Sequence, residues 1–139
     1  AIQIPKGSTG ARVIVRLMRE NKFVAMLTDQ KMNDGLPARF FGLPAMTPNA
    51  PAGLAVRYNI PVVPAWIERL EGVHFRVVVY DPIVARPGAD PVEEVQRITQ
   101  ELNDFLEARI RERPEQWLWL HDRWTAPRRR RRRWTQTEE

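Results

Sequence analysis

The feature that most constrains this chain is a cluster of tryptophans near its C-terminus. Three of its five tryptophans fall within residues 114–124, interleaved with Glu115, His121 and Arg123. An indole N–H needs a hydrogen-bond partner when it is buried, so the cluster requires a built environment. One interpretation is a C-terminal amphipathic helix whose aromatic side chains close the core. The other is that the polar residues between the tryptophans line a site or face a membrane surface, and this segment alone leaves both open.

Length and composition limit the class of protein. A chain of 139 residues is expected to form one domain with a real core. It contains no cysteine, which excludes a disulfide scaffold, a cysteine metal site and a cysteine nucleophile. No run approaches the roughly 20 apolar residues of a membrane helix. Residues 1–4 are typical of the middle of a strand, so we expect the chain to be part of a longer protein.

The positive charge is concentrated in the last residues. Six consecutive arginines and two glutamates give residues 125–139 a charge of +4, which leaves +1 of the total +5 for residues 1–124. Adjacent arginines repel one another and offer no apolar face, so we expect residues 125–139 to be a disordered basic tail. Such a tail could bind anionic lipid, bind nucleic acid through phosphates, or simply be solvated. The near-neutral residues 1–124 argue against a nucleic-acid groove binder.

Hydrophobic periodicity predicts three helices. The first spans residues 9–20, and the second spans residues 48–58 with Pro51 in its first turn. The third is a long amphipathic helix over residues 91–113, which Pro114 ends. The apolar side of this third helix consists of Val95, Ile98, Leu102, Phe105, Leu106, Ala108 and Ile110.

Strands are predicted between these helices. Residues 23–27 are a short apolar run that is typical of a buried strand, and residues 40–41 predict a second short strand. Residues 61–67 and 73–80 predict a hairpin that turns at Glu71-Gly72. Helices that alternate with buried strands indicate an α/β fold, with a mixed sheet flanked by helices, over residues 1–124.

Three residues are candidates for binding chemistry because of their placement. Asp29 and Gln30 directly follow the predicted strand at residues 23–27, and ligands of open α/β sheets bind beyond the carboxyl ends of strands. Asp29 could instead cap the turn at Asn33-Asp34-Gly35. Lys6 lies at a strand-to-helix junction, where it could hold an anion or simply be solvated.

The remaining motifs exclude several kinds of site. His74 alternates with apolar residues on a predicted strand and is expected to face solvent, whereas His121 could orient a carboxylate or a phosphate. No Ser-His-Asp arrangement, no cluster of metal ligands and no phosphate-binding glycine loop can be identified. The sequence therefore gives no reason to expect a cofactor.

Five segments, in this order and spacing, resemble a known family. They are Ile4-Pro5-Lys6-Gly7, Met26-Leu27-Thr28-Asp29-Gln30-Lys31, Phe40-Phe41-Gly42-Leu43-Pro44-Ala45-Met46-Thr47, Pro61-Val62-Val63-Pro64 and the tryptophan segment 114–124. Over residues 2–124 the chain resembles the late acyltransferases of lipid A biosynthesis, the lauroyl/myristoyl acyltransferase family, which is related to the glycerolipid acyltransferases.

The resemblance implies an activity and its partners. These enzymes transfer a fatty acyl chain from acyl carrier protein, or sometimes from coenzyme A, to a hydroxyl of a lipid A precursor. They work at the cytoplasmic face of the inner membrane of Gram-negative bacteria, and the basic tail would meet the anionic membrane surface. The candidate substrate-binding residues are Lys6, Asp29, Gln30, Arg39, Phe41, Thr47, Glu115, His121 and Arg123.

Three of the positions have counterparts in the glycerolipid enzymes. Asp29 would match the glutamate of their Phe-Pro-Glu-Gly block in the acceptor site, and Pro64 would match the proline of their last block. Lys6 would stand where those enzymes use an arginine to hold an acceptor phosphate. Thr28, Gln30 and Lys6 depart from the pattern of those blocks.

One departure dominates, because the family needs a His-x4-Asp/Glu pair. Its histidine takes the proton from the acceptor hydroxyl, and its carboxylate orients the histidine. Neither His74 nor His121 has a carboxylate at that spacing, and the family's N-terminal membrane helix is missing as well. We therefore expect a partial acyltransferase fold that carries acceptor-site elements, has no catalytic residue of its own and is inactive alone. The alternative is a non-catalytic module that uses the Arg-rich tail to bind membranes.

Overall fold

The computed structural model describes residues 3–4, 8–120 and 122–124. Its elements, in chain order, are α1 (Ser8–Arg19), β1 (Leu36–Phe40), β2 (Leu43–Thr47), α2 (Ala50–Tyr58), β3 (Ala65–Arg69), β4 (Phe75–Val79), α3 (Pro91–Glu112) and the 3₁₀ turn η1 (Pro114–Gln116). The α/β class is confirmed, but the described strands form two separate antiparallel hairpins rather than one mixed sheet. Lys6, His121 and the tail 125–139 lie outside the described residues.

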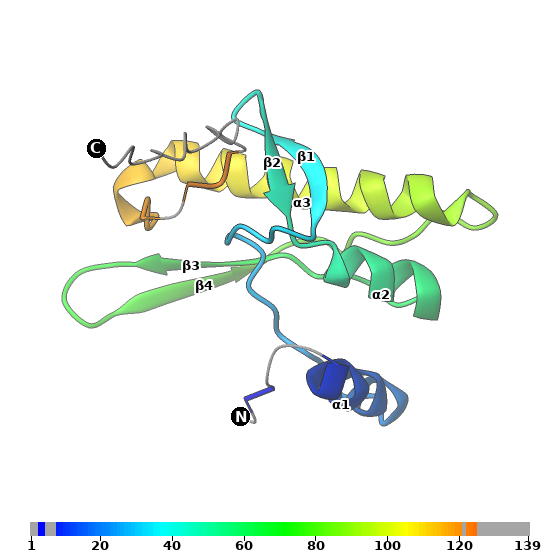
Figure 1. The fold of residues 1–139 in the computed structure, drawn as a ribbon. Helices are drawn as coiled ribbons and strands as arrows, with labels where there is room; N and C mark the ends of the chain where they lie inside the picture. Colours follow the sequence, from blue (N-terminus) through cyan, green and yellow to red (C-terminus); the bar gives the residue numbers. More distant parts are fainter. Residues whose placement is uncertain (1–2, 5–7, 121, 125–139) are drawn as a thin grey trace, which may run out of the picture.

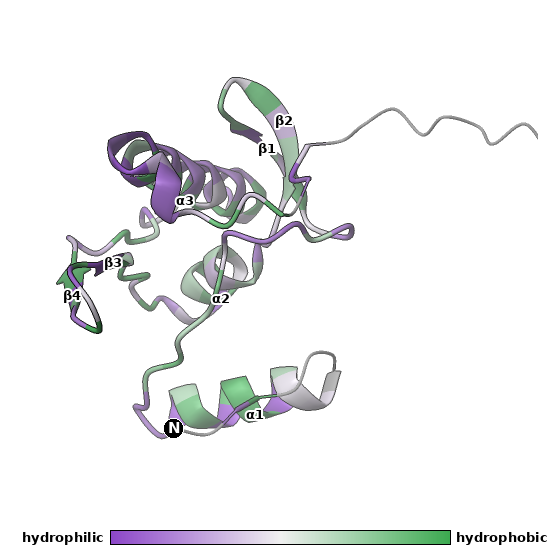
Figure 2. Ribbon diagram, turned by 90° about the vertical axis from the view of Figure 1, so that its left-hand side faces the viewer, coloured by the Kyte–Doolittle hydropathy of each residue, from purple (hydrophilic) through white to green (hydrophobic). Residues whose placement is uncertain are grey.

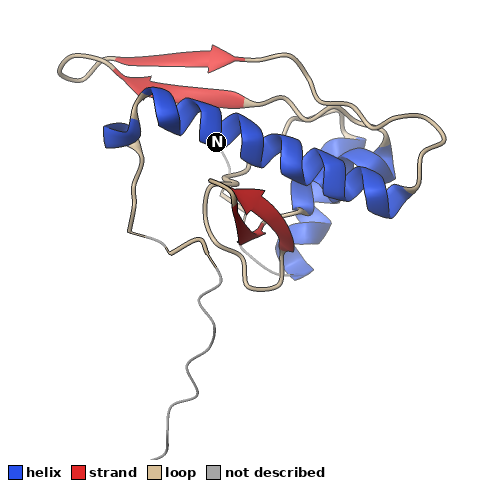
Figure 3. Cartoon of the chain, turned by 90° about the horizontal axis from the view of Figure 1, so that it is seen from above, coloured by secondary structure: helices blue, strands red, loops and turns tan. Residues whose placement is uncertain are grey.

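The long helix α3 organises the molecule and runs between the two hairpins (Figure 3). It begins at Pro91, and the Asp90 side chain caps it by accepting hydrogen bonds from the first free backbone N–H groups. It ends at Glu112, one residue before the Arg113 end that the sequence predicts. Six of the seven predicted apolar positions are buried or half-buried, but Ala108 is exposed, because it lies at the edge of the stripe.

The β1–β2 hairpin packs upright against α3 (Figure 1). Phe41 and Gly42 form its two-residue turn with φ of 51° and 78°, the positive values that a tight hairpin turn requires. Ala45 and Thr47 of β2 face inward and are buried. The sequence predicts only the short strand at residues 40–41 here, because prolines within both strands hide the alternating pattern.

The predicted second helix is confirmed as α2, and it packs on α3. The small residues Ala52 and Ala55 are fully buried against Ile98 and Leu102 of α3. Pro51 stands in the first turn of α2, where its missing N–H costs no helical hydrogen bond. The close packing follows from these alanines, whose short side chains let the two helices approach.

The predicted hairpin at residues 61–80 is confirmed as β3 and β4, with the turn at Leu70–His74. The pairs Ile67↔Val77 and Ala65↔Val79 share one face of the hairpin. Ile67, Val77 and Val79 are each more than 60% exposed, so this apolar face is uncovered by the described residues. Figure 2 shows the β3–β4 hairpin, with hydrophobic stretches along β4, at the outer edge of the molecule.

The prediction of a buried strand at residues 23–27 is wrong for the described chain. This segment is extended, yet Phe23 is 94% and Leu27 is 81% exposed. A strand needs a neighbour to satisfy its backbone N–H and C=O groups, and the described residues supply none. The helix α1, which confirms the prediction at residues 9–20, lies apart from α3 on the other side of this segment (Figure 1).

The tryptophan segment is not a continuous helix, although its aromatic side chains do close the core. After η1 it runs irregularly across the ends of α3 and the β1–β2 hairpin. Trp117 is buried against Phe40, and the Trp124 indole donates a 2.9 Å hydrogen bond to the Phe40 carbonyl. Trp124 also forms a backbone bridge with Ala45 at the edge of β2. Among the described residues, no helix combines the length and apolarity that crossing a bilayer requires.

Candidate functional site

One arginine from the tryptophan segment joins three parts of the fold. Arg123 is 0% exposed. Its Nη1 donates to the backbone carbonyl oxygens of Asp29, at 2.5 Å, and of Thr28, at 3.4 Å. Its Nη2 donates to Thr47 Oγ1 at 3.1 Å and to Asn103 Oδ1 at 3.2 Å. We call Asp29, Thr47, Asn103 and Arg123 the Arg123 cluster.

The neighbours of Arg123 in the chain direct its side chain inward. Asp122 Oδ1 accepts a 3.0 Å hydrogen bond from the Trp124 N–H, which forms a tight turn around Arg123. Trp124 is fixed on the β1–β2 hairpin at Ala45 and Phe40. The guanidinium then lies over the Phe40 ring at 4.6 Å from its centroid, a favourable cation–π geometry.

Thr47 and Asn103 form the floor of the cluster. Thr47 Oγ1 donates to the Ala45 carbonyl and accepts from Asn103 Nδ2 at 3.0 Å. Asn103 Nδ2 also donates to the Arg39 carbonyl on β1 at 3.2 Å. These hydrogen bonds orient both side chains independently of Arg123, with oxygen atoms facing its guanidinium.

Gly35 makes this arrangement sterically possible. It lies directly against the backbone of Thr47, so that a Cβ atom at Gly35 would collide with the Thr47 carbonyl group. The Gly35 N–H closes the turn before β1 by donating to the Met32 carbonyl at 2.9 Å. The turn chemistry at Asn33-Asp34-Gly35 thus sets the position of β2 as well as the direction of the chain.

Two polar atoms of the cluster have no hydrogen-bond partner among the described residues. They are Arg123 Nε and Asp29 Oδ1, and both are buried. Burial lowers the pKa of Arg123, and the nearby charge of Asp29 opposes this shift. Arginine nevertheless keeps its charge at neutral pH. The cluster therefore offers a buried positive charge, one spare donor and one spare carboxylate acceptor.

The structure brings together three of the nine candidate substrate-binding residues, namely Asp29, Thr47 and Arg123. Asp29 Oδ1 accepts no hydrogen bond from the turn at residues 33–35, so this oxygen does not act as its cap. Gln30 and Glu115 are exposed, outside the cluster.

The other candidates hold the hairpin or lie outside the described residues. The Arg39 side chain is exposed, while its backbone N–H and C=O pair with the Gln100 amide at 2.8 and 2.9 Å. The half-buried Phe41 is fixed on α3 by a 2.6 Å hydrogen bond from its N–H to Glu107 Oε2. Lys6 and His121 are not among the described residues.

Sequence reasoning missed Asn103, the fourth member of the cluster. It stands beside Leu102 within the apolar stripe of α3, and four residues after the buried Thr99. A polar residue that interrupts an apolar stripe must find buried partners, which is the signal that could have identified it.

The described residues contain neither a catalytic pair nor a metal centre. His74 is exposed in the β3–β4 turn, where its Nδ1 lies 3.1 Å from the Glu71 carbonyl oxygen. No group of three or more His, Asp or Glu side chains gathers as metal ligands in the part of the chain that the structure describes. The cluster can bind and orient a polar group, but it holds no residue placed to act as a general base.

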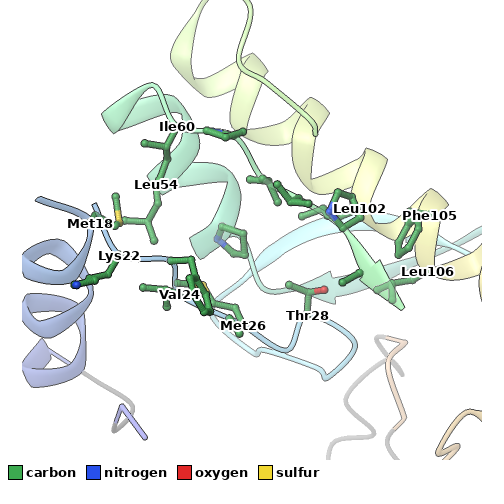
Figure 4. Close-up of a pocket in the computed structure, with 18 of the residues that line it drawn as sticks. Met18, Lys22, Val24, Met26, Thr28, Leu54, Ile60, Leu102, Phe105 and Leu106 are labelled. Carbon is green, nitrogen blue, oxygen red and sulfur yellow. The ribbon is translucent and has the colours of Figure 1, made fainter. Parts of the chain in front are cut away.

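An apolar cavity of about 630 Å³ has Thr28, the residue before Asp29, in its lining (Figure 4). It separates the extended residues 22–28 and the end of α1 from α2, α3 and residues 60–65. Apolar side chains such as Val24, Leu54 and Phe105 line it. Thr28 links the cavity to the cluster, because it lines the cavity and its carbonyl oxygen accepts from Arg123.

Comparisons with known proteins identify what this arrangement resembles. The sequence profile of the family described as bacterial lipid A biosynthesis acyltransferase matches residues 3–126. The chain is also similar to the phosphatidylinositol mannoside acyltransferases of Mycobacterium tuberculosis strains CDC 1551 / Oshkosh and ATCC 25618 / H37Rv, at 29% identity over 117 residues in each case. That match covers 82% of this chain and 34% of each relative, so the chain spans about a third of the length of these curated relatives.

Proposed function

The chain belongs to the bacterial lipid A biosynthesis acyltransferase family. We propose that it is the acceptor-binding part of an enzyme that acylates a lipid A precursor. The acyl donor is an acyl carrier protein thioester or an acyl-CoA, and the acceptor is a hydroxyl of the precursor. The reaction takes place at the cytoplasmic face of the inner membrane of a Gram-negative bacterium. The observation that carries the proposal is the position of Asp29, held beside a buried arginine in the segment that the resemblance pairs with the acceptor block.

The chemistry divides between two parts of the enzyme. The acceptor hydroxyl attacks the thioester carbonyl, a histidine takes the hydroxyl proton, the new C–O bond forms, and the C–S bond breaks as the thiolate leaves. The histidine and its carboxylate belong to a part of the protein outside this chain. Asp29 contributes by accepting a hydrogen bond from an acceptor hydroxyl at its free Oδ1, which orients the acceptor for attack.

The exposed apolar surface supports a second part of the domain. Phe23 and Leu27 of the extended segment, together with Ile67, Phe75 and Val77 of the β3–β4 hairpin, are each at least 60% exposed. Such a surface is typical of an interface. We assign it to the rest of the acyltransferase domain, because the chain spans only 34% of the length of its curated relatives.

A second candidate acceptor is a mannosylated phosphatidylinositol. It is favoured by the similarity to the two phosphatidylinositol mannoside acyltransferases. Both acceptors present a sugar hydroxyl on an anionic lipid, so the role of Asp29 is the same for both. The difference between them is in the headgroup, which the described residues of this chain leave open.

The proposal is tested by offering the full-length protein both donors and both acceptors. We expect acylation of the lipid A precursor with acyl carrier protein thioester or acyl-CoA, and no turnover by residues 1–139 alone. Transfer to the phosphatidylinositol mannoside but not to the precursor would favour the second candidate. Turnover by residues 1–139 would overturn the division of the chemistry.

Absence of turnover with every pair would favour the alternative of a non-catalytic membrane module. That alternative makes its own prediction about residues 125–139. Their deletion should abolish salt-sensitive binding to anionic liposomes, because six arginines near a surface contribute on the order of 6 kcal/mol at most. Binding that survives the deletion and resists salt would assign the membrane contact to the aromatic segment instead.

A further inference from the structure

We infer that Arg123 is a positioning residue that sets the place of Asp29 by binding the main chain of the segment that carries it. The inference rests on the proposed function for what Asp29 does, but not for how Asp29 is held. The guanidinium binds the carbonyl oxygens of Thr28 and Asp29 and leaves the Asp29 carboxylate oxygen Oδ1 unpaired. Arg123 therefore fixes the backbone without making a hydrogen bond to the carboxylate oxygen Oδ1.

The segment that carries Asp29 has no other hydrogen-bonded support among the described residues. Between Phe23 and Gln30 the structure shows no strand pairing and no helix, and the hydrogen bonds to this segment are the two from Arg123. The nearest other anchors are the end of α1, at Lys22, and two hydrogen bonds after the segment: Lys31 Nζ donates to the Trp124 carbonyl at 3.3 Å, and the Met32 N–H donates to the Met46 carbonyl. All described hydrogen bonds between these eight extended residues and the core thus come from a single side chain.

The geometry requires an arginine rather than any cation. Nη1 faces the segment with Asp29, while Nη2 faces Thr47 on β2 and Asn103 on α3. The planar group between them stacks on the Phe40 ring. A lysine ammonium is a single point with no fork, so it cannot reach both sides at once.

Stability alone does not explain this arrangement. A fully buried charge without a paired carboxylate costs desolvation free energy, and well-packed apolar residues often stabilise a core as well or better. No ion pair to Arg123 within 4.0 Å joins it to an acidic group in the part of the chain that the structure describes. What the arginine supplies is a defined place for the segment between the cavity and the cluster.

Limited trypsin proteolysis of the full-length protein tests this positioning role without any substrate, because Lys22 and Lys31 flank the segment. Arg123→Lys and Arg123→Met should speed cleavage after Lys22 and Lys31 by about tenfold or more, while cleavage within α3 stays unchanged. The matched control is Arg111→Met, since Arg111 stacks on Phe41 at 4.8 Å but is exposed. Unchanged cleavage after Lys22 and Lys31 in Arg123→Lys would overturn the inference.

A second variant distinguishes local release of residues 23–30 from global unfolding of the Arg123 variants. The variant Thr47→Val nearly conserves the side-chain volume and removes one of the two acceptors that orient Nη2 of Arg123. It should speed cleavage after Lys22 and Lys31 by a smaller factor than Arg123→Lys, with α3 unchanged. Cleavage that rises equally within α3 and after Lys22 and Lys31 would show a purely structural role and overturn the inference.

Kinetics of the full-length enzyme then separate positioning from general damage. Arg123→Lys should raise KM for the lipid acceptor by about tenfold and change KM for the acyl donor by less than about twofold. A fall in kcat with both KM values unchanged would mean that the variant merely reduces the active fraction, and would overturn the inference. If the wild-type protein transfers no acyl group, the proposed function fails, and the proteolysis measurements still decide whether Arg123 positions the segment.

Discussion

The two hairpins of this chain have similar local structure but opposite surroundings. The β1–β2 hairpin lies between α3 and the tryptophan segment, and its inward residues Phe40, Ala45 and Thr47 are almost completely buried. The β3–β4 hairpin presents an apolar face on which Ile67 and Val77 are each more than 60% exposed. Each hairpin joins two strands that are close in the sequence, but only the β1–β2 hairpin has its apolar face covered within the described residues.

Side chains of α3 explain much of this difference. Gln100 bonds both backbone groups of Arg39 in β1, and Glu107 accepts the Phe41 N–H, so they replace a neighbouring strand. On the other hairpin, Gln116 bonds both backbone groups of Arg69, at the far end of β3. A hairpin is therefore held in place by the residues that cover its face. We expect a further part of the protein to cover the exposed face of the β3–β4 hairpin.

The largest expected effect is on the stability of the covered β1–β2 hairpin. Phe40→Ala should lower the free energy of unfolding by about 3–5 kcal/mol, because Phe40 is fully buried between aromatic rings. Phe75→Ala should change the stability of residues 1–139 by less than about 1 kcal/mol, because Phe75 is 60% exposed. Urea-induced unfolding of both variants measures the two values.

The same two variants, made in the full-length protein, test whether the β3–β4 hairpin is covered there. If the rest of the domain covers the β3–β4 hairpin, Phe75→Ala should cost about 2 kcal/mol or more there. An equally small cost in both proteins would contradict the packing that we propose. Phe40→Ala serves as the reference, since its environment is complete within the described residues.

The next effect concerns activity rather than stability. In the full-length enzyme, Asp29→Ala should lower acyl transfer by about 10- to 100-fold, because the acceptor loses a group that orients it. The folded yield should change little, because Asp29 Oδ1 makes no hydrogen bond among the described residues. Asp34→Ala, an exposed aspartate in the following turn, is the control. An active and stable Asp29→Ala variant would reduce Asp29 to a residue of the loop.

Much of the fold was predictable because its signals are local. Proline punctuation and apolar periodicity placed α1, α2, α3 and the β3–β4 hairpin within a few residues of their observed bounds. The five family segments also identified the family, which the match over residues 3–126 confirms. These features can be predicted from residues that are close in the sequence, or from the order of the family segments along the chain.

The rest depended on tertiary contacts that no local pattern records. The buried strand expected at residues 23–27 is exposed, because strand pairing requires a neighbour from elsewhere. The role of Asn103 became visible only when α3 met Thr47 and Arg123. Arg123 was a candidate substrate-binding residue, and its four described hydrogen bonds are all to the protein itself.

A smaller effect tests the spacing between the turn and the cluster. Gly35→Ala should destabilise the protein by about 1–3 kcal/mol, because the new methyl group meets the Thr47 carbonyl and must displace β2. Gly53→Ala in α2 is the matched control, since the space around Gly53 is open and alanine favours the helix by up to about 1 kcal/mol. Thermal unfolding of the two variants should therefore shift in opposite directions. A Gly35→Ala variant as stable as the wild type would show that β2 can move without cost.

The smallest expected effect is a pH dependence at the far end of α3. Glu94 is 1% exposed, and its hydrogen bonds from the Arg97 side chain and the Arg86 backbone N–H lower its pKa to about 2. The unfolded state, with its pKa near the ordinary value of 4.5, binds more protons than the folded state between these values. This contribution to stability is therefore complete above about pH 5 and is lost as the pH falls toward 2. Urea-induced unfolding from pH 6 to pH 3 should show a shallower decline for Glu94→Gln than for the wild type. Glu93→Gln, on the exposed side of the same helical turn, should follow the wild type, and a Glu94→Gln profile parallel to the wild type would contradict the assignment.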